Sequence, residues 1–230
     1  MDEGELRKLV ENYQPNTRVL KIMGRIRVVA IVGPSASGKT TLMNFLTKND
    51  SEFGFILDET SRAPRSGEKQ GTDYLFRSPK EIIEDARRGN LVQIAIGPNG
   101  DLYCTRLDSY PMGHIGLIAL VPAAVEEFRR LPVASFKAFF TVPPSYEVWE
   151  ERLTKQAADS NWSAEKMQER LIEAKASFEF ALSDKDVHFI LNDEVEQAAK
   201  HLKHLLNNQI NTEREEKARK IAESLRSKLI

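Results

Sequence analysis

The stretch that decides the fold is residues 33–40, which read Gly33-Pro34-Ser35-Ala36-Ser37-Gly38-Lys39-Thr40. It follows the β-branched run 26–32 and precedes residues 40–48, whose apolar positions have helical spacing. A strand that ends in a glycine-rich turn and opens a helix directs backbone N–H groups and a positive dipole end at one point. The pattern therefore predicts a phosphate-binding loop.

The chemically distinctive residues of this loop have separate expected roles. Glycine at 33 and 38 lets the backbone turn tightly and approach an anion closely. Lys39 is expected to reach the outer phosphates of a nucleotide, and the Thr40 hydroxyl is expected to hold a magnesium ion. A glycine-containing turn without a ligand is the alternative, and the flanking strand and helix disfavour it.

The composition is that of an ordinary globular protein. The chain has 230 residues, of which 41% are hydrophobic and 29% charged, with a net charge of −1. No global basic field argues for nucleic acid or a membrane surface, so we expect neither as a partner. The single cysteine, Cys104, excludes an internal disulfide framework and suits a reducing compartment. The acidic residues 1–5 do not resemble a secretory signal, and the apolar run 115–125 is too short to span a bilayer, so we expect a cytoplasmic protein.

Strand-like and helix-like segments alternate along most of the chain. Apolar runs typical of strands buried on both faces of a parallel sheet occur at 26–32, 115–121, 136–142 and 187–191. Segments with helical spacing occur at 40–48, 123–131, 146–156 and 164–182. The alternation predicts an α/β fold, with a mostly parallel sheet and helices on both faces.

A hairpin-rich segment at 58–107 interrupts this alternation, as an inserted subdomain would. The pattern of residues 91–96 and 101–105 predicts two strands of an antiparallel hairpin. The polar break 157–163 lies between two helices and is suited to a mobile lid. The expected division is an N-terminal helical extension at 1–25, a core at 26–57, 108–147 and 185–211, the inserted subdomain at 58–107, a lid at 148–184 and a C-terminal helical extension at 212–230.

A second constellation lies in the inserted segment. Arg62 and Arg65 stand three apart in a turn-rich stretch and can converge on one dianion, each with a bidentate fork. Tyr74 and Tyr103 could donate hydroxyls to the same group, while Glu68 could orient an arginine or touch a ribose. Taken alone, the segment could equally be a solvated basic loop. Beside a phosphate-binding loop, an anion site is favoured.

The two motifs together resemble those of the guanylate kinase family, over about residues 26–206. The family carries Thr-Thr-Arg-x-x-Arg-x-Gly-Glu-x-x-Gly-x-Asp-Tyr-x-Phe behind a phosphate-binding loop, and residues 60–76 are similar to it. The resemblance implies a P-loop NTPase fold of three layers, with an inserted monophosphate-binding subdomain and a helical lid. It also implies transfer of the ATP γ-phosphoryl to a nucleoside monophosphate, by family default GMP, with Mg²⁺.

Residue by residue, the resemblance implies three groups of functional side chains. The catalytic residues would be Lys39, Arg152 and Arg170. The ATP site would comprise Gly33, Pro34, Ser35, Ala36, Ser37, Gly38, Lys39, Thr40, Thr41 and Asn192, with Thr40 as the metal ligand. The monophosphate site would comprise Asp58, Arg62, Arg65, Glu68, Tyr74, Gln93, Tyr103 and Thr105. The next lid arginine of the family pattern falls on Gln156.

The positions that would read the base depart from the family pattern. Asp58 stands in place of a serine and Gln93 in place of a glutamate. Guanine presents an acceptor at O6 and donors at N1 and N2, whereas adenine presents an amino donor and an acceptor at N1. Asp58 could accept from the adenine amino group while the Gln93 amide donates to N1. We therefore expect a guanine preference that is relaxed or shifted towards AMP.

Two further alternatives follow from the sequence. The Asp-x-Asp of the family falls on Ala119-Leu120-Val121, so both carboxylates are missing. The second hypothesis is therefore a catalytically weak guanylate-kinase-like binding or regulatory module. Lys39 and Thr40 are intact and favour the enzyme. A kinase of a sugar phosphate fits the loop but not the 62–68 motif.

The tail at 212–230 has its apolar side chains on one helical stripe. An amphipathic helix needs a surface to cover. The sequence leaves two alternatives for that surface: the core of the same chain, or a second copy in a homo-oligomer.

Overall fold

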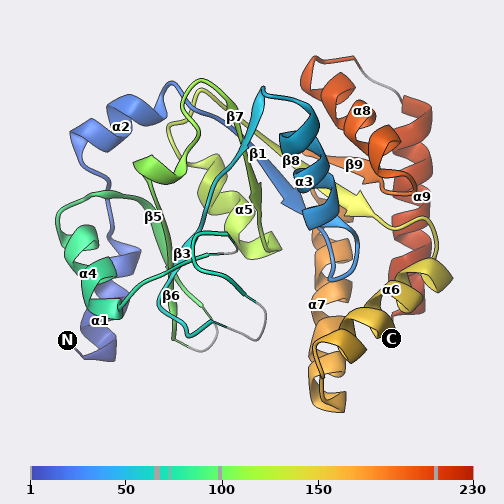
Figure 1. The fold of residues 1–230 in the computed structure, drawn as a ribbon, viewed down its shortest axis with the longest axis horizontal. Coiled ribbons are helices and arrows are strands. Elements are labelled where there is room, and N and C mark those ends of the chain that lie inside the picture. Colours follow the sequence, from blue (N-terminus) through green and yellow to red (C-terminus); the bar gives the residue numbers. More distant parts are fainter. Residues whose placement is uncertain (1, 65–67, 73, 98–99, 210–211, 230) are drawn as a thin grey trace. The chain divides into compact units, whose positions relative to one another are not determined.

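The structure is a computed structural model that describes residues 2–64, 68–72, 74–97, 100–209 and 212–229 (Figure 1). The chain divides into two compact units. The first unit comprises Met1–Val28, Glu52–Gly116 and Leu131–Ser135. The second unit comprises Val29–Ser51, Leu117–Arg130 and Phe136–Ile230.

Helices and strands alternate over most of the described chain, which confirms the predicted α/β class. The helices are α1 (Glu3–Glu11), α2 (Thr17–Met23), α3 (Lys39–Asn49), α4 (Pro79–Arg87), the 3₁₀ turn η1 (Leu107–Ser109), α5 (Pro122–Arg129), α6 (Tyr146–Asp159), α7 (Ala164–Ser183), α8 (Val195–Leu206) and α9 (Thr212–Lys228). The strands are β1 (Arg27–Val32), β2 (Phe53–Phe55), β3 (Glu59–Thr60), β4 (Leu75–Phe76), β5 (Leu91–Ile96), β6 (Leu102–Arg106), β7 (Ile115–Ala119), β8 (Ser135–Val142) and β9 (Val187–Leu191).

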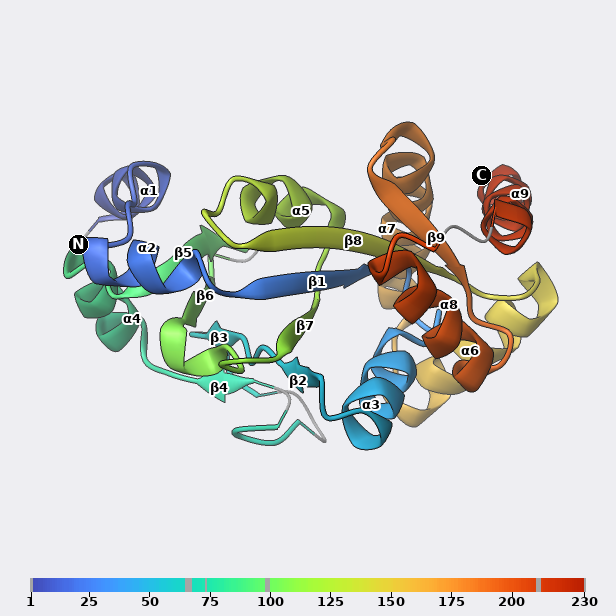
Figure 2. The same cartoon turned by 90° about the horizontal axis from the view of Figure 1, so that it is seen from above.

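The larger sheet has the strand order β2-β7-β1-β8-β9, with β8 and β9 parallel and in register from Ala138↔Val187 to Val142↔Leu191. β1 and β9 are almost wholly buried, as strands covered on both faces should be. Within the second unit, α3 and α8 lie on one side of β1 and β8, and α5 and α7 on the other (Figure 2). β9 is the last strand of this order.

The smaller sheet belongs to the first unit and has the order β4-β3-β6-β5. β5 and β6 pair antiparallel, as predicted for the hairpin, although residues 98–99 of its tip lie outside the described residues. α1 and α4 pack together beside this sheet (Figure 1). They cover one of its faces through Leu6, Leu9, Val10 and Ile83, packed on a cluster of Ile82, Ala86, Leu91, Ile94, Leu102 and Cys104.

The sequence-based boundaries were wrong in two places. Gln14-Pro15-Asn16 has the pattern of a helix stop within the extension predicted at 1–25. Asn16 nevertheless also caps a second helix, α2, with its side chain accepting from the Val19 N–H at 3.0 Å. α6 continues to Asp159, so the break before α7 is confined to residues 160–163. Both errors arise because short polar segments carry stop and start signals that look alike.

The C-terminal helix packs on its own chain. α9 lies beside β9 and α7 and buries Ala218, Ala222, Leu225 and Leu229 (Figures 1 and 2). The apolar stripe is therefore covered by the core of the same chain, the first of its two alternatives. In the described part of the chain, no helix combines the length and apolar character needed to cross a membrane.

Candidate active site

The glycine-rich loop connects β1 to α3, as predicted. Gly33 has φ +148° and Gly38, which caps α3, has φ +90°, a region that favours glycine. A Cβ on Gly33 would lie 2.5 Å from Thr141 Oγ1, and a Cβ on Gly38 would lie 2.1 Å from Asn192 Nδ2. Glycine is therefore required at both positions, for its backbone freedom and for its lack of a side chain.

Side chains from distant segments hold the loop from behind. The buried Ser37 hydroxyl lies 2.7 Å from Thr141 Oγ1, which also donates to the Val32 carbonyl at 3.1 Å. Asn192 Nδ2 donates to the Ser37 carbonyl at 2.9 Å, and Trp149 Nε1 donates to the Ser35 carbonyl at 2.8 Å. Sequence reasoning missed Thr141 and the hydrogen bond from Trp149 to the loop. A buried indole needs a hydrogen-bond partner, and that was the available signal.

The Lys39 ammonium is hydrogen-bonded to two carbonyl oxygens of its own loop. Its Nζ donates to Gly33 O at 2.7 Å and to Pro34 O at 2.8 Å. Burial lowers the pKa of the Lys39 ammonium to about 8; the positive charge of Arg170 adds to the shift and Glu173 opposes it. The negative charge of a bound polyphosphate would stabilise the charged form of the Lys39 ammonium.

A cavity of about 660 Å³ opens at the loop and the start of α3. It brings together most of the residues predicted for the nucleotide and adds Asp193 and Val195. Its lining is Ser35, Ala36, Gly38, Lys39, Thr40, Thr41, Arg152, Gln156, Asn192, Asp193 and Val195. Gly33, Pro34 and Ser37 lie behind this lining, as parts of the loop backbone that contact Lys39, Thr141 and Asn192.

The two arginines predicted for catalysis differ in their surroundings. Arg152, on α6, lines the cavity and makes no ion pair with any residue that the structure describes. Arg170, on α7, pairs with Glu173 at 2.5 Å, and its guanidinium lies 5.6 Å from the centroid of the Trp162 ring. Arg170 is absent from the cavity lining, yet its charge is close enough to lower the pKa of Lys39.

The donor set suits a magnesium ion that is shared with phosphates. Thr40 is exposed at the first turn of α3 and lines the cavity. Within the described residues there is no cluster of three or more His, Cys, Asp or Glu side chains that could hold a metal. Mg²⁺ commonly keeps several waters and binds through substrate phosphates, so one hydroxyl beside a phosphate loop is compatible with it.

Three of the residues predicted for the monophosphate, Gln93, Tyr103 and Thr105, share one face of the smaller sheet. Thr60 stands opposite Tyr103, and Gln93 stands opposite Thr105, so these side chains point to the same side. A register shift between Leu91 and Gln93 is what turns Gln93 to this face, because Leu91 pairs with Arg106 on the other. We call this the open face, since α1 and α4 cover the opposite one.

Arg62 is held firmly in the first unit. Its Nη1 and Nη2 donate to the two Glu68 carboxylate oxygens at 2.7 and 2.6 Å, and its guanidinium lies 4.9 Å from the centroid of the Tyr74 ring. Glu68 and a hydrogen bond with Tyr103 raise the pKa of Arg62. Glu68 thus orients the arginine, one of the two roles predicted for it. Arg65 lies outside the described residues.

Asp58 and Thr105 occupy buried polar surroundings. Burial raises the pKa of Asp58 to about 7, and the nearby charge of Glu59 adds to the shift. Thr105 is fully buried, with its hydroxyl 2.9 Å from Tyr110 Oη. Sequence reasoning missed Tyr110, whose pKa is raised by burial and by the charge of Asp58.

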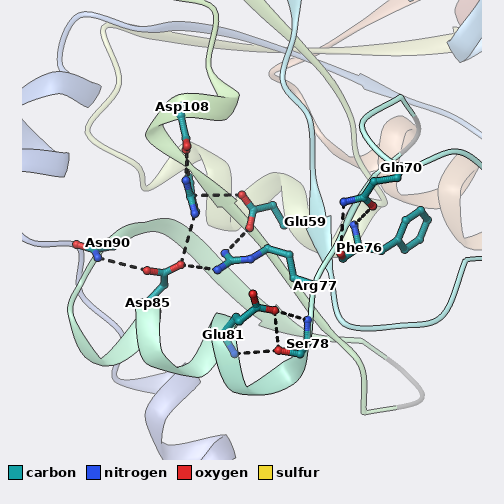
Figure 3. A network of polar contacts seen from close by, with 10 residues as sticks. Glu59, Gln70, Phe76, Arg77, Ser78, Glu81, Asp85, Asn90 and Asp108 are labelled. Carbon is teal, nitrogen blue, oxygen red and sulfur yellow. Dashed lines mark hydrogen bonds and ion pairs between the residues drawn. The ribbon is translucent and has the colours of Figure 1, made fainter.

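A charged network on the covered side of the sheet was also missed (Figure 3). Glu59 is 1% exposed and accepts from Arg77 Nη1 at 2.6 Å, with Arg106 Nε at 3.5 Å. Arg77 also reaches Asp85 at 2.9 Å, and Arg106 pairs with Asp108. Glu59 lies opposite Cys104, so strand alternation places a carboxylate on an apolar face. That mismatch was the signal that a cation must accompany it.

The glycine-rich phosphate loop connects a strand of a mostly parallel sheet to a helix. This arrangement defines the class of P-loop nucleotide-binding enzymes, to which the chain belongs. The family model described as Guanylate kinase matches residues 25–209. The chain therefore belongs to the guanylate kinase family, a family of nucleoside monophosphate kinases, as its two motifs predicted.

Named relatives and a solved structure agree with this assignment. "Guanylate kinase" of Corynebacterium diphtheriae is 33% identical over 187 residues, covering 78% of this chain and 94% of the relative. "Guanylate kinase" of Sus scrofa is 31% identical, covering 82% and 96%. "Guanylate kinase 1" of Arabidopsis thaliana is 33% identical, and this chain spans about half of its length, 46%. The crystal structure of guanylate kinase from Anaplasma phagocytophilum shares the fold, with TM-score 0.50 and 22% identity over 90% of this chain and 97% of that one.

Proposed function

We propose that the protein transfers the γ-phosphoryl group of ATP to a nucleoside monophosphate, with GMP as the family's acceptor and AMP as a competing one. The observation that carries the proposal is the convergence of Lys39, Thr40 and Arg152 on one cavity at the phosphate loop. Family membership suggests the acceptor class, and Arg62, held by Glu68, offers a phosphate-binding group for that acceptor.

Phosphoryl transfer requires positioning and positive charge more than covalent chemistry. An oxygen of the acceptor phosphate forms a bond to the γ-phosphorus while the bond to the β–γ bridging oxygen breaks, and ADP leaves. Lys39 and Arg152 would stabilise the charge on the transferred group, with Arg170 nearby. Arg62, with Arg65, would hold the acceptor phosphate in line. We also propose that residues 148–184 act as a lid that excludes water from this step.

Magnesium would bind through Thr40 Oγ1 and the ATP phosphates. When bound, the ion neutralises the developing charge on the phosphate oxygens. Around it, the loop N–H groups and the Lys39 ammonium would orient the triphosphate. Asn192 would keep the loop in shape, since its amide already bonds to the Ser37 carbonyl.

The pKa of Lys39 predicts that ATP affinity depends on pH. Only the charged ammonium attracts phosphate, so ATP binding favours protonation of a group whose pKa in the free protein is about 8. The affinity for ATP should therefore have its full value below pH 8. Above pH 8 it should decline about tenfold per pH unit, until the pH reaches the higher pKa that Lys39 has in the ATP complex. Calorimetry in buffers of different ionisation enthalpy should detect proton uptake at pH 8.5. A constant dissociation constant from pH 7 to pH 9.5 would contradict the prediction.

The residues that would contact the base of the acceptor differ from the family pattern. We propose that the preference for guanine is therefore relaxed. Asp58 and Gln93 stand where the family has serine and glutamate, and Gln93 is turned to the open face together with Tyr103. A carboxylate accepts, and an amide both donates and accepts, so the pair complements the amino group and N1 of adenine. Polar groups left unpaired against the wrong base can change selectivity by orders of magnitude.

The test is ADP release with GMP, AMP, CMP and UMP, each measured with ATP and Mg²⁺. We expect turnover with GMP and AMP of comparable kcat/KM, and little with the pyrimidines. Strong selectivity for GMP would overturn the relaxed base preference but not the kinase. Binding of ATP without turnover of any monophosphate would favour the binding or regulatory module, for which the lack of acidic side chains at Ala119 and Val121 is the motivating observation.

The raised pKa of Asp58 predicts that base selectivity changes with pH. Below pH 7 the protonated carboxyl can donate to guanine O6, and above pH 7 the carboxylate can accept from the adenine amino group. Glu59, Tyr74, Cys104 and Tyr110 are titratable neighbours that interact electrostatically with it. The ratio of kcat/KM for AMP to that for GMP should therefore rise from pH 6 to pH 8.

The control for this pH effect is Asp58→Asn, whose amide does not titrate and should give a ratio independent of pH. The prediction fails if the unmodified protein shows a flat ratio, or if the variant shows the same slope.

A further inference from the structure

The turn after β9 forms part of the wall of the nucleotide cavity. Asn192 and Asp193 line the cavity, and the Asn192 amide bonds to the phosphate loop at Ser37 O. The Asn192 N–H donates to Val142 O at 2.8 Å, which ties the turn to β8. The position of this turn therefore affects the shape of the loop and of the cavity together.

α9 holds this turn from the outside. Arg214 Nη2 donates to the Leu191 carbonyl at 3.3 Å and to Asp193 Oδ1 at 2.5 Å. One guanidinium thus bridges the residues on both sides of Asn192. The ion pair is partly exposed, with the Arg214 side chain 23% exposed and that of Asp193 33% exposed.

The neighbouring residue of α9 fixes the helix along the same strand. Glu215 Oε1 accepts from the Phe189 N–H at 3.2 Å and lies 3.0 Å from His188 Nδ1. α9 therefore satisfies polar groups along the outer side of β9, the last strand of its sheet. The helix lies beyond residue 209, where the match to the family model ends.

We propose that Arg214 is a positioning residue for nucleoside triphosphate binding, acting through Asp193 and the backbone of the 191–193 turn; this rests on the proposed ATP site. Its charge neutralises a carboxylate in the wall of a cavity that has to accept a polyphosphate. Without it, Asp193 repels the phosphates across a partly desolvated space, and the turn that carries Asn192 loses its outer support. The C-terminal helix is thereby part of the ATP site, although none of its described residues lines the cavity.

The experiment measures ATP binding by calorimetry and the KM for each substrate in the full chain. Arg214→Gln should raise the ATP dissociation constant about tenfold, the size expected for one charge-assisted contact, while the KM for the monophosphate stays within twofold. Arg214→Lys should recover part of the affinity. Adding Asp193→Asn to Arg214→Gln should bring the ATP dissociation constant back to within about threefold of the original.

The matched control is Arg219→Gln on the same helix. Arg219 lies 4.5 Å from the centroid of the Phe189 ring and donates to the Leu182 carbonyl at 3.4 Å. This variant should lower thermal stability at least as much as Arg214→Gln, yet leave ATP affinity unchanged.

An unchanged ATP affinity in Arg214→Gln overturns the proposal, and so does an equal loss in Arg219→Gln. A double variant that recovers no affinity overturns the neutralisation of Asp193. Failure of the unmodified protein to bind ATP would instead refute the proposed function.

Discussion

Replacing Lys39 by methionine should lower kcat for phosphoryl transfer about 10³-fold. Methionine keeps much of the side-chain volume but removes the ammonium. In the free protein that ammonium already lies on the loop, bonded to Gly33 O and Pro34 O. Because the charge it would stabilise is greatest in the transition state, the loss in kcat should exceed the loss in ATP affinity.

The measurement is single-turnover formation of the diphosphate product at saturating ATP, so that binding and chemistry are separated. Lys48→Met is the matched control, because Lys48 is an exposed lysine in the last turn of the same helix. It should retain full activity. A Lys39→Met enzyme within tenfold of the original would show that the loop does not serve the reaction.

Replacing Arg77 by methionine should lower the free energy of unfolding by about 3–5 kcal/mol. Arg77 is the closest cation to Glu59, which is 1% exposed, and it links that carboxylate to Asp85 of α4 (Figure 3). Its removal leaves Glu59 with Arg106 Nε at 3.5 Å. A carboxylate buried beside an apolar cluster without close compensation is among the costliest defects in a folded domain.

Urea unfolding at equilibrium measures this free energy. Arg7→Met is the control, because the Arg7–Glu3 pair is exposed, at 63% and 79%, and its loss should leave the free energy of unfolding nearly unchanged. Adding Glu59→Gln to Arg77→Met should recover part of the loss, since the amide carries no charge. A change below about 1 kcal/mol in Arg77→Met would contradict the assigned role of the network.

The local patterns of the chain predicted much of the fold. The helical spacing of apolar residues at 40–48 marked α3, and the apolar run before Gly33 marked β1. These signals act between residues three or four apart, or along one strand, so they can be read without the tertiary fold. Within the extension predicted at 1–25, α2 was not separated from α1, because its seven residues rely on the Asn16 cap and on burial of Val19 and Met23.

By itself, the sequence determined that residues 33–40 form a phosphate loop between a strand and a helix, because that loop depends on glycines and on neighbouring elements. Only the tertiary structure decided what stands behind and beside it. The contacts of Ser37 with Thr141, of Trp149 with Ser35 and of Asn192 with Ser37 join residues more than 100 positions apart. The direction of Gln93 likewise depends on a bulge in its pairing with β6. Such contacts follow from how strands pair and helices pack, which no short stretch of sequence encodes.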